Sequence, residues 1–331
     1  MKPLIAIIGT GGTISSVVDD SLDVLNYPDI GRKMDPAEAI KRIPEATRFA
    51  EYVTVPFRFV GSTAIVPEDW IELAQLISKT AVERPEIKGF VILHGTATIE
   101  ETGYFLNLVL KTEKPVVLVG AQRPASAVST DVNMNVLAAI RTAISEQAIG
   151  KGVLVVLNDE IHSARDATKT STYRLQTFQS RDFGLLGHVD GDKVVFYRAP
   201  LRKHTTQSPF DIAEITSLPR VDIAYSYGGA DGCAVQAFVA AGAKGIVSAG
   251  LAPGIPTPAE RKALEDAVAK GIVVVQSSRA GSGRVARRQY LQNQNIVAAD
   301  NLNPQKARVL LALALTKTSD PDEIQAYFET L

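Results

Sequence analysis

Two threonine-centred segments carry residue types that can perform nucleophilic chemistry. The first, Thr10–Ile14, reads Thr-Gly-Gly-Thr-Ile, and the second, His94–Thr98, reads His-Gly-Thr-Ala-Thr. A threonine hydroxyl attacks a carbonyl only when a neighbouring group removes its proton or orients it. The reactive candidates are Thr13 and Thr96, although a threonine beside glycines is also a common turn residue.

A third segment supplies a candidate base. Residues 164–170 read Ala-Arg-Asp-Ala-Thr-Lys-Thr, which places Lys169 among small polar residues. A lysine that is desolvated in a closed site loses proton affinity and can accept a proton, whereas an exposed lysine stays charged. Both interpretations of Lys169 remain open on the residues alone.

Buried strands are expected to position both threonine segments. Residues 3–9 and 89–93 are short apolar runs typical of parallel strands, and each ends just before a threonine segment. Ligands of open α/β sheets bind outside the carboxyl ends of the strands, so we expect both hydroxyls in one crevice. The polar segment Ser15–Gly31 follows the first turn and is expected to form a mobile lid, with a solvated connection as the alternative.

The remaining chain alternates apolar runs with segments of helical period. Strands are expected at 4–8, 90–93, 116–119, 153–157, 245–248 and 272–276, and helices at 67–81, 133–146 and 257–270. This alternation predicts parallel sheets covered by helices. The irregular stretch 199–219 is expected to link a larger domain, 1–198, to a smaller one, 220–331.

Composition excludes several classes of function. The 331 residues include 35 basic and 36 acidic side chains, so no global field favours nucleic acid or a membrane surface. Cys233 is the single cysteine and the four histidines are scattered, which leaves no pattern for a metal site. No export signal or membrane-spanning run is apparent, which predicts a cytoplasmic protein.

The chain resembles bacterial-type L-asparaginases and glutaminase-asparaginases along nearly its whole length. The matching motifs, in order, are Thr10–Ile14, Asn26-Tyr27, Val60–Ser62, His94–Thr96 with Glu100–Thr102, Gly120–Pro124, Asn158-Asp159, Arg165–Thr170, Arg202–Thr205 and Asn303–Arg308. The resemblance implies an α/β fold with a larger, flavodoxin-like N-terminal domain and a smaller α/β C-terminal domain. It also implies a homodimer or homotetramer in which the C-terminal domain completes the site of a neighbouring subunit.

The chemistry implied by the resemblance is that of a threonine amidohydrolase, with no metal or organic cofactor. A threonine attacks a side-chain carboxamide, ammonia leaves, and water releases the acid from an acyl-enzyme. Thr13 would be the primary nucleophile, and Tyr27 on the lid would hydrogen-bond to it. Thr96 and Lys169 would form a second hydroxyl–amine pair.

The resemblance also implies residues on the substrate side. Ser62 would hold the α-carboxylate of the substrate, and the other substrate-binding positions would be Gly12, Thr63, Gly95 and Ala97. Backbone N–H groups near Thr96 and Ala97 would face the carboxamide oxygen, where fixed donors stabilise an oxyanion.

Several positions depart from the family pattern. Ala97 stands where the family has an aspartate that contacts the α-ammonium of the substrate, and Thr63 stands where it has a glutamine. No acid follows Ser277-Ser278-Arg279 before Asp300, although the family carries a glutamate there, and the turn at Gly228-Gly229 is one residue shorter. Arg284, Arg287 and Arg288 occupy that stretch instead; these arginines are expected either to be solvated or to contact an anionic substrate or the neighbouring subunit.

The departures predict a substrate without a free α-ammonium group. Candidates are a dicarboxylic acid monoamide, an N-substituted asparagine or glutamine, or a cyclic imide or lactone. Two alternatives stay open: an ordinary L-asparaginase inactivated by an Asp-to-Ala change at Ala97, and a non-catalytic metabolite-binding homologue. Loss of the neighbouring carboxylate should also lower the pKa of Lys169 relative to a family member that keeps it.

Overall fold

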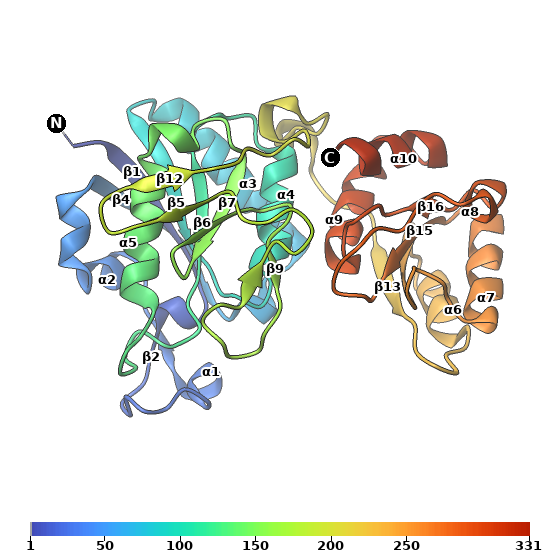
Figure 1. The fold of residues 1–331 in the computed structure, drawn as a ribbon, viewed down its shortest axis with the longest axis horizontal. Coiled ribbons are helices and arrows are strands. Elements are labelled where there is room, and N and C mark those ends of the chain that lie inside the picture. Colours follow the sequence, from blue (N-terminus) through green and yellow to red (C-terminus); the bar gives the residue numbers. More distant parts are fainter. Residues whose placement is uncertain (1) are drawn as a thin grey trace. The chain divides into compact units, whose positions relative to one another are not determined.

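The computed structural model describes residues 2–331, which divide into two compact units (Figure 1). The first unit ends at Ala213 and the second runs from Glu214 to Leu331. The division falls inside the predicted linker. The first part of this predicted linker packs into the N-terminal unit rather than linking the two units. Thr205, Ser208 and Phe210 are buried there around a short 3-10 turn at Thr205–Gln207.

An eight-stranded sheet forms the centre of the N-terminal unit. Its parallel strands are β1 (Leu4–Gly11), β4 (Glu51–Val60), β5 (Ile87–Leu93), β6 (Val116–Val119) and β7 (Val153–Leu157), and its antiparallel strands are β8 (Glu160–Ser163), β11 (Gly187–Val189) and β12 (Val194–Phe196). The spatial order is β12-β11-β8-β7-β6-β5-β1-β4. Taken in chain order, the parallel strands follow the flavodoxin-like order 2-1-3-4-5. The chain therefore leaves β1 and β5 toward opposite sides of the sheet.

Helices cover both faces of this sheet in Figure 1. They are α2 (Pro36–Lys41), α3 (Pro67–Glu83), α4 (Ile99–Val109) and α5 (Val132–Ala143). Alternate strand residues such as Ile5, Ile7 and Val91 share one core cluster with Ile40 of α2 and Ile140 of α5. The period of two along each strand places the intervening side chains on the opposite face. This double coverage explains why the parallel strands are continuous apolar runs.

Short elements surround the carboxyl edge of the sheet. They are β2 (Ser16–Val17) paired with β3 (Arg32–Lys33), the helical turn α1 (Tyr27–Ile30), and β9 (Thr168–Lys169) paired with β10 (Phe178–Gln179). The predicted lid thus has short elements of its own. Its base is held by hydrogen bonds from Ala125 N to Ser16 O at 2.8 Å and from Val128 N to Ser21 O at 3.0 Å.

A parallel four-stranded sheet forms the C-terminal unit. Its strands are β13 (Val221–Tyr225), β14 (Gly245–Gly250), β15 (Val273–Ser278) and β16 (Val297–Ala298), in sequential order. Its helices are α6 (Cys233–Ala240), α7 (Pro258–Ala269), α8 (Gln289–Asn293), α9 (Pro304–Ala314) and α10 (Pro321–Thr330). At the start of α7, Thr257 and Glu260 form a capping box, as the acid and proline of that segment predict.

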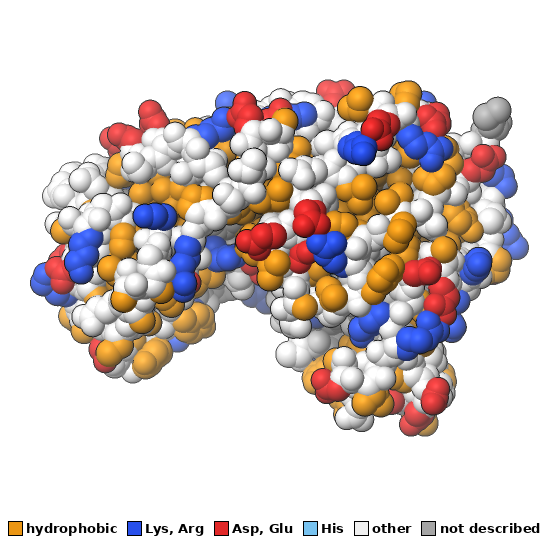
Figure 2. All heavy atoms as spheres, turned by 180° about the vertical axis from the view of Figure 1, so that it is seen from behind, with side chains coloured by type: hydrophobic (Ala, Val, Ile, Leu, Met, Phe, Trp, Pro, Cys, Tyr) orange, Lys and Arg blue, Asp and Glu red, His pale blue; other side chains and the backbone are white. Residues whose placement is uncertain are grey.

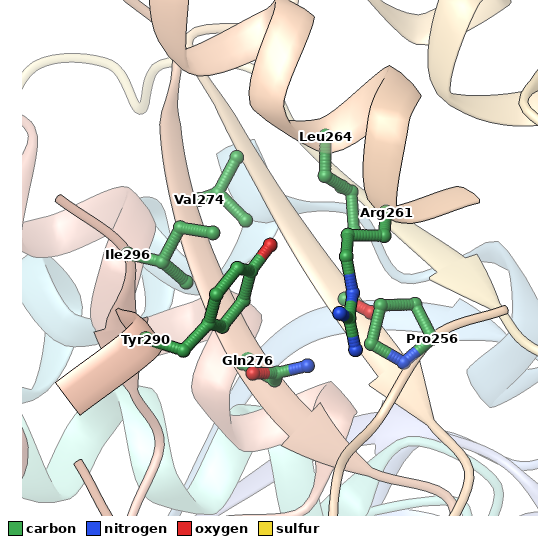
Figure 3. Close-up of a pocket in the computed structure, with 8 residues that line it drawn as sticks. Pro256, Arg261, Leu264, Val274, Gln276, Tyr290 and Ile296 are labelled. Atoms are coloured by element: carbon green, nitrogen blue, oxygen red, sulfur yellow. The ribbon is translucent and has the colours of Figure 1, made fainter. Parts of the chain in front are cut away.

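A small cavity of about 10 Å³ lies within the C-terminal unit (Figure 3). Arg261 lies over the ring of Tyr290 at 4.8 Å, and the Tyr290 hydroxyl donates to Glu265 at 2.7 Å. A cavity of this size accommodates about one water molecule. It is therefore too small for an amide substrate.

The three arginines of the departing stretch bind partners within the C-terminal unit. Arg284 pairs with Asp300 at 2.8 Å, Arg287 pairs with Asp322, and Arg288 lies 3.5 Å from the Gln276 side-chain oxygen. Ion pairs of this exposed kind contribute little to stability. Within this unit the first two arginines thus each have a carboxylate partner.

The α/β fold with its larger and smaller sheet units confirms the predicted fold class. The predicted strands 116–119 and 153–157 match β6 and β7, and the helix predicted at 133–146 ends earlier, at Ala143. On the face drawn in Figure 2, basic and acidic side chains are interspersed. No helix among residues 2–331 is long and apolar enough to cross a membrane.

Candidate active site

The two threonine segments meet where the chain leaves β1 and β5. A Cβ on Gly12 would lie 2.2 Å from the Cα of Gly95, and Gly12 has a φ of +82° that favours glycine. These two backbones therefore touch at the carboxyl edge of neighbouring strands. This edge is the switch point at which ligands bind in open α/β sheets.

Thr13 contacts the tyrosine of the predicted lid. The Thr13 Oγ1 and the Tyr27 hydroxyl oxygen are 2.9 Å apart, and either can be the donor. Burial raises the pKa of Tyr27, partly offset by its hydrogen bond to Thr13, so the phenol stays protonated near neutral pH. Thr13 itself is half-buried at the start of a 3-10 turn, Thr13–Ser15. The contact orients a hydroxyl that is open to a ligand on one side.

Thr96 and Lys169 form the second pair that the sequence predicts. The Lys169 Nζ lies 2.6 Å from the Thr96 Oγ1. Lys169 sits on β9, where pairing with Phe178 of β10 fixes its backbone. Burial lowers the pKa of Lys169, and the nearby Glu100 carboxylate raises it less. The amine is therefore easier to deprotonate than an exposed lysine.

Gln122 joins this pair, although we did not identify it from the sequence. Its Oε1 lies 2.9 Å from the Lys169 Nζ and 3.0 Å from the Thr96 Oγ1. Gln122 stands just beyond β6, which neighbours β5 in the sheet. The signal in the sequence is a polar residue shortly after an expected strand, within the Gly120–Pro124 motif.

Ser62 lies against the second threonine segment. The Ala97 N–H donates to the Ser62 Oγ at 3.2 Å, and the Thr98 Oγ1 donates to the Ser62 carbonyl oxygen at 2.9 Å. A Cβ on Gly95 would lie 2.6 Å from the Ser62 Oγ. The Ser62 hydroxyl retains its proton as a donor for a ligand. The Ala97 N–H, by contrast, is already engaged, so the expectation that it faces the carboxamide oxygen does not match this arrangement.

Ala97 and Thr63 are exposed, whereas their neighbours Thr96 and Ser62 are buried. Ala97 presents only a methyl group. The Glu100 carboxylate on α4 is 5% exposed and raises the pKa of Lys169. The site thus keeps its hydroxyls and its amine but has an uncharged residue at position 97.

His94 supports the second threonine segment from within the core. Its side chain is fully buried and its Nδ1 lies 2.8 Å from the carbonyl oxygen of Gly95. Because a carbonyl can only accept, the proton belongs on Nδ1. Burial lowers the pKa of His94 to about 4, so the ring is neutral at physiological pH.

All the predicted catalytic and substrate-binding residues belong to the N-terminal unit. Hydrogen bonds or close contacts link most of them into two groups: Thr13 with Tyr27, and Thr96 with Lys169 beside Ala97, Ser62, Gly95 and Gly12. Thr63 has no hydrogen bond to either group among those observed. Across residues 2–331, no cluster of three or more His, Cys, Asp or Glu side chains could hold a metal ion.

Comparison with known families extends over both units. Residues 4–202 match the family model of the asparaginase N-terminal domain, and residues 220–328 match that of the glutaminase/asparaginase C-terminal domain. L-asparaginase 2 of Bacillus subtilis is 42% identical over 98% of this chain and 86% of its own length. Glutaminase-asparaginase of Pseudomonas fluorescens is 38% identical over 98% of this chain and 89% of its own length.

A solved structure resembles the whole chain. The crystal structure of a probable cytoplasmic L-asparaginase from Campylobacter jejuni superimposes with a TM-score of 0.96 at 42% identity, covering 100% of both chains. The similarity therefore includes the fold of both units and the connection between them in sequence.

Proposed function

This chain belongs to the asparaginase and glutaminase family of amidohydrolases, and we propose that it hydrolyses the carboxamide of a small carboxylated substrate with release of ammonia. The hydrogen bond of 2.6 Å between the half-buried Lys169 amine and the Thr96 hydroxyl supports catalysis most directly. Burial lowers the pKa of this amine, which makes it a better proton acceptor at neutral pH than an exposed lysine.

In the proposed reaction Thr13 is the first nucleophile. Its oxygen bonds to the carboxamide carbon while its proton moves to the Tyr27 oxygen and the Tyr27 proton passes on to the carboxamide nitrogen, so the phenol is neutral before and after the step. Collapse of the tetrahedral intermediate breaks the C–N bond, and the leaving nitrogen, which carries this proton, departs as ammonia. A threonine ester remains on the enzyme.

The second pair completes the turnover. Neutral Lys169 accepts a proton from the attacking water through Thr96, and this proton is then returned to the departing Thr13 oxygen as the acid product leaves, which restores both the neutral amine and the Thr13 hydroxyl. Ser62 donates its hydroxyl proton to the substrate carboxylate. No metal or organic cofactor takes part in this scheme.

We further propose that the substrate lacks a free α-ammonium group. Ala97 presents a methyl group at the position that resembles the family's ammonium-binding aspartate, and loss of one such charge-assisted contact is worth about 1.5–3 kcal/mol. A dicarboxylic acid monoamide, such as succinamate or maleamate, satisfies Ser62 and the two threonines without that contact. N-substituted asparagine or glutamine, a cyclic imide and a lactone are the other substrates of this kind.

Self-association and location are parts of the same proposal. The first unit holds the hydroxyls and the amine, so a homodimer or homotetramer in which a neighbouring C-terminal unit covers the site would exclude water from it. We propose a cytoplasmic location by analogy with the probable cytoplasmic L-asparaginase of Campylobacter jejuni, although a 42% identical relative from Haemophilus influenzae is a probable periplasmic L-asparaginase.

A panel of amides tests the function. Ammonia release from L-asparagine, L-glutamine, succinamate, maleamate, N-acetyl-asparagine and succinimide is measured for the wild-type protein and for Ala97→Asp. We expect turnover of at least one analogue without the ammonium group, with weak activity toward L-asparagine, and a shift toward L-asparagine in Ala97→Asp.

Two outcomes would favour the alternatives. If the wild type released no ammonia from any panel member while Ala97→Asp hydrolysed L-asparagine, Ala97 would be an inactivating change in an ordinary asparaginase. Saturable binding of a panel member without ammonia release by either protein would indicate a non-catalytic metabolite-binding homologue.

A further inference from the structure

The geometry points to Gln122 as the residue that positions the Thr96–Lys169 pair, a role that rests on the proposed function. One oxygen, the Gln122 Oε1, accepts from the Lys169 Nζ at 2.9 Å and from the Thr96 Oγ1 at 3.0 Å, while the Nζ and Oγ1 are 2.6 Å apart. The three side-chain atoms therefore form a closed triangle. Gln122 therefore gives the proposed base, Lys169, and its hydroxyl partner, Thr96, one further hydrogen bond each.

The orientation of the Gln122 amide is fixed by its other end. The Nε2 donates to the carbonyl oxygens of Arg174 at 3.1 Å and Thr172 at 3.4 Å. A carbonyl cannot donate, so the amide nitrogen must face these two groups and the amide oxygen must face the lysine. Gln122 is 8% exposed, which limits competition from solvent.

The backbone at Gln122 is held as well. Its N–H donates to Asp131 Oδ2 at 2.9 Å, and the next N–H, of Arg123, donates to Asp131 Oδ1 at 2.9 Å. The Asn135 side chain donates to the same carboxylate at 3.1 Å. Asp131 thereby anchors the chain beyond β6, and Gln122 reaches the pair from a rigid base.

An amide oxygen suits both protonation states of the lysine. When Lys169 is charged, its ammonium donates to both the Gln122 Oε1 and the Thr96 Oγ1, and the threonine donates to the amide. When Lys169 is neutral, its lone pair accepts a hydrogen bond from the Thr96 hydroxyl while an N–H still donates to the amide. The heavy atoms need not move between these two states, which lowers the reorganisation required during proton transfer.

The absence of charge on Gln122 is equally important. The Glu100 carboxylate on α4 raises the pKa of Lys169. The Asp131 carboxylate accepts hydrogen bonds from two backbone N–H groups. The side chains of Arg123 and Arg174 line a neighbouring polar cavity. A second carboxylate at position 122 would hold the proton on the amine. An amide positions the lysine without that effect.

Two substitutions separate positioning from charge. Gln122→Met removes the acceptor at similar volume, and we expect kcat for the best panel amide to fall 10-fold or more at the plateau of the pH profile, with KM changed less than threefold. Gln122→Glu adds a carboxylate, and we expect the pH at which activity reaches half its maximum to rise by one unit or more. Gln176→Met, at an exposed glutamine lining the same polar cavity, is the matched control.

A measurement that does not depend on turnover accompanies these assays. Trace acetylation of Lys169 with acetic anhydride, quantified by mass spectrometry against pH, reports the protonation of the amine directly. We expect the Lys169 titration to move upward in Gln122→Glu and to keep its wild-type midpoint in the control. This result would support the role of Gln122 even if no panel amide were hydrolysed.

Wild-type kcat and an unchanged Lys169 labelling curve in Gln122→Met would overturn the inference. So would a Gln122→Glu protein whose labelling curve coincides with the wild type while its circular dichroism spectrum and melting temperature are unchanged. A failure of the amide panel with the expected labelling shifts would count against the proposed function alone.

Discussion

Gly12 and Gly95 are in backbone contact, because a Cβ atom on Gly12 would lie only 2.2 Å from the Gly95 Cα. This contact joins the segment after β1 to the segment after β5. Thr13 and Thr96 are the residues that follow the two glycines directly. The separation of the two proposed reactive hydroxyls is thus set by how closely two main chains approach, which no flexible side chain can alter.

Gly12→Ala should therefore damage both stability and activity. The added methyl meets backbone atoms at 2.2 and 2.6 Å, and the residue also has a φ of +82°. We expect the free energy of unfolding to fall by about 3 kcal/mol or more, with a melting temperature lower by about 6 °C or more. Gly150→Ala is the matched control, because Gly150 has a φ of +68° but nothing within 4 Å of its Cβ position. An equal loss in both variants would assign the effect to φ alone.

Removal of the Thr13 hydroxyl should abolish turnover. We expect Thr13→Val to reduce kcat by about 10³-fold or more, since the valine keeps the volume but lacks the nucleophile. Tyr27→Phe removes the hydroxyl that accepts the Thr13 proton at 2.9 Å but leaves the nucleophile in place, so a smaller fall of about 10- to 100-fold is expected. Ammonia release and burst kinetics would measure both, with the exposed Tyr197→Phe as control. A Thr13→Val protein with wild-type turnover would exclude Thr13 as the nucleophile.

Activity should depend on neutral Lys169. Because burial lowers the pKa of Lys169, the amine loses its proton at a lower pH than the usual value of about 10.4, and kcat/KM should rise with pH through this lowered pKa. Lys169→Met should remove the pH-dependent rise and most of the activity. Lys193→Met, at an exposed lysine of the same unit, should change neither. Near-wild-type turnover by Lys169→Met would remove the lysine from the mechanism.

Stability should fall on acidification because of His94. Its pKa is about 4 in the folded protein against about 6.5 when unfolded, so the unfolded state binds the proton more tightly and stability rises with pH between these values. The full effect is about 3 kcal/mol between pH 6.5 and 4. Urea unfolding of the wild type and of His94→Asn at pH 7.5, 5.5 and 4.5 measures it. Parallel stability curves for the two proteins would show that His94 does not titrate on unfolding.

The central strands were predictable from the sequence because burial of both faces of the sheet makes each of these strands a continuous apolar run. β5, β6 and β7 are apolar runs between helical segments, and their ends were close to the predicted ones. β4 gave no such signal, since this edge strand carries Glu51, Pro56 and Arg58 and is only partly buried. β8, β11 and β12 are too short for a period of two to stand out.

The candidate site was predictable to the extent that its residues follow long strands. Thr13 and Thr96 follow such strands closely. Lys169 instead lies on a two-residue hairpin strand, for which the sequence contains no local pattern, and it contacts Thr96 from there. Gln122 could not be assigned a role from the sequence, because its contacts join residues 26 and 47 positions away. Long-range contacts of this kind depend on the strand order.

The division between buried Thr96 and exposed Ala97 bears on how such proteins diversify. Ala97 projects from the loop between β5 and α4 without any packing role in the core, and exposed substitutions of this type usually change stability by no more than about 0.5 kcal/mol. An exchange between an acid and a methyl group at this position would therefore leave the fold and the other reactive groups in place, and under the proposed function it would change only which substrates are recognised.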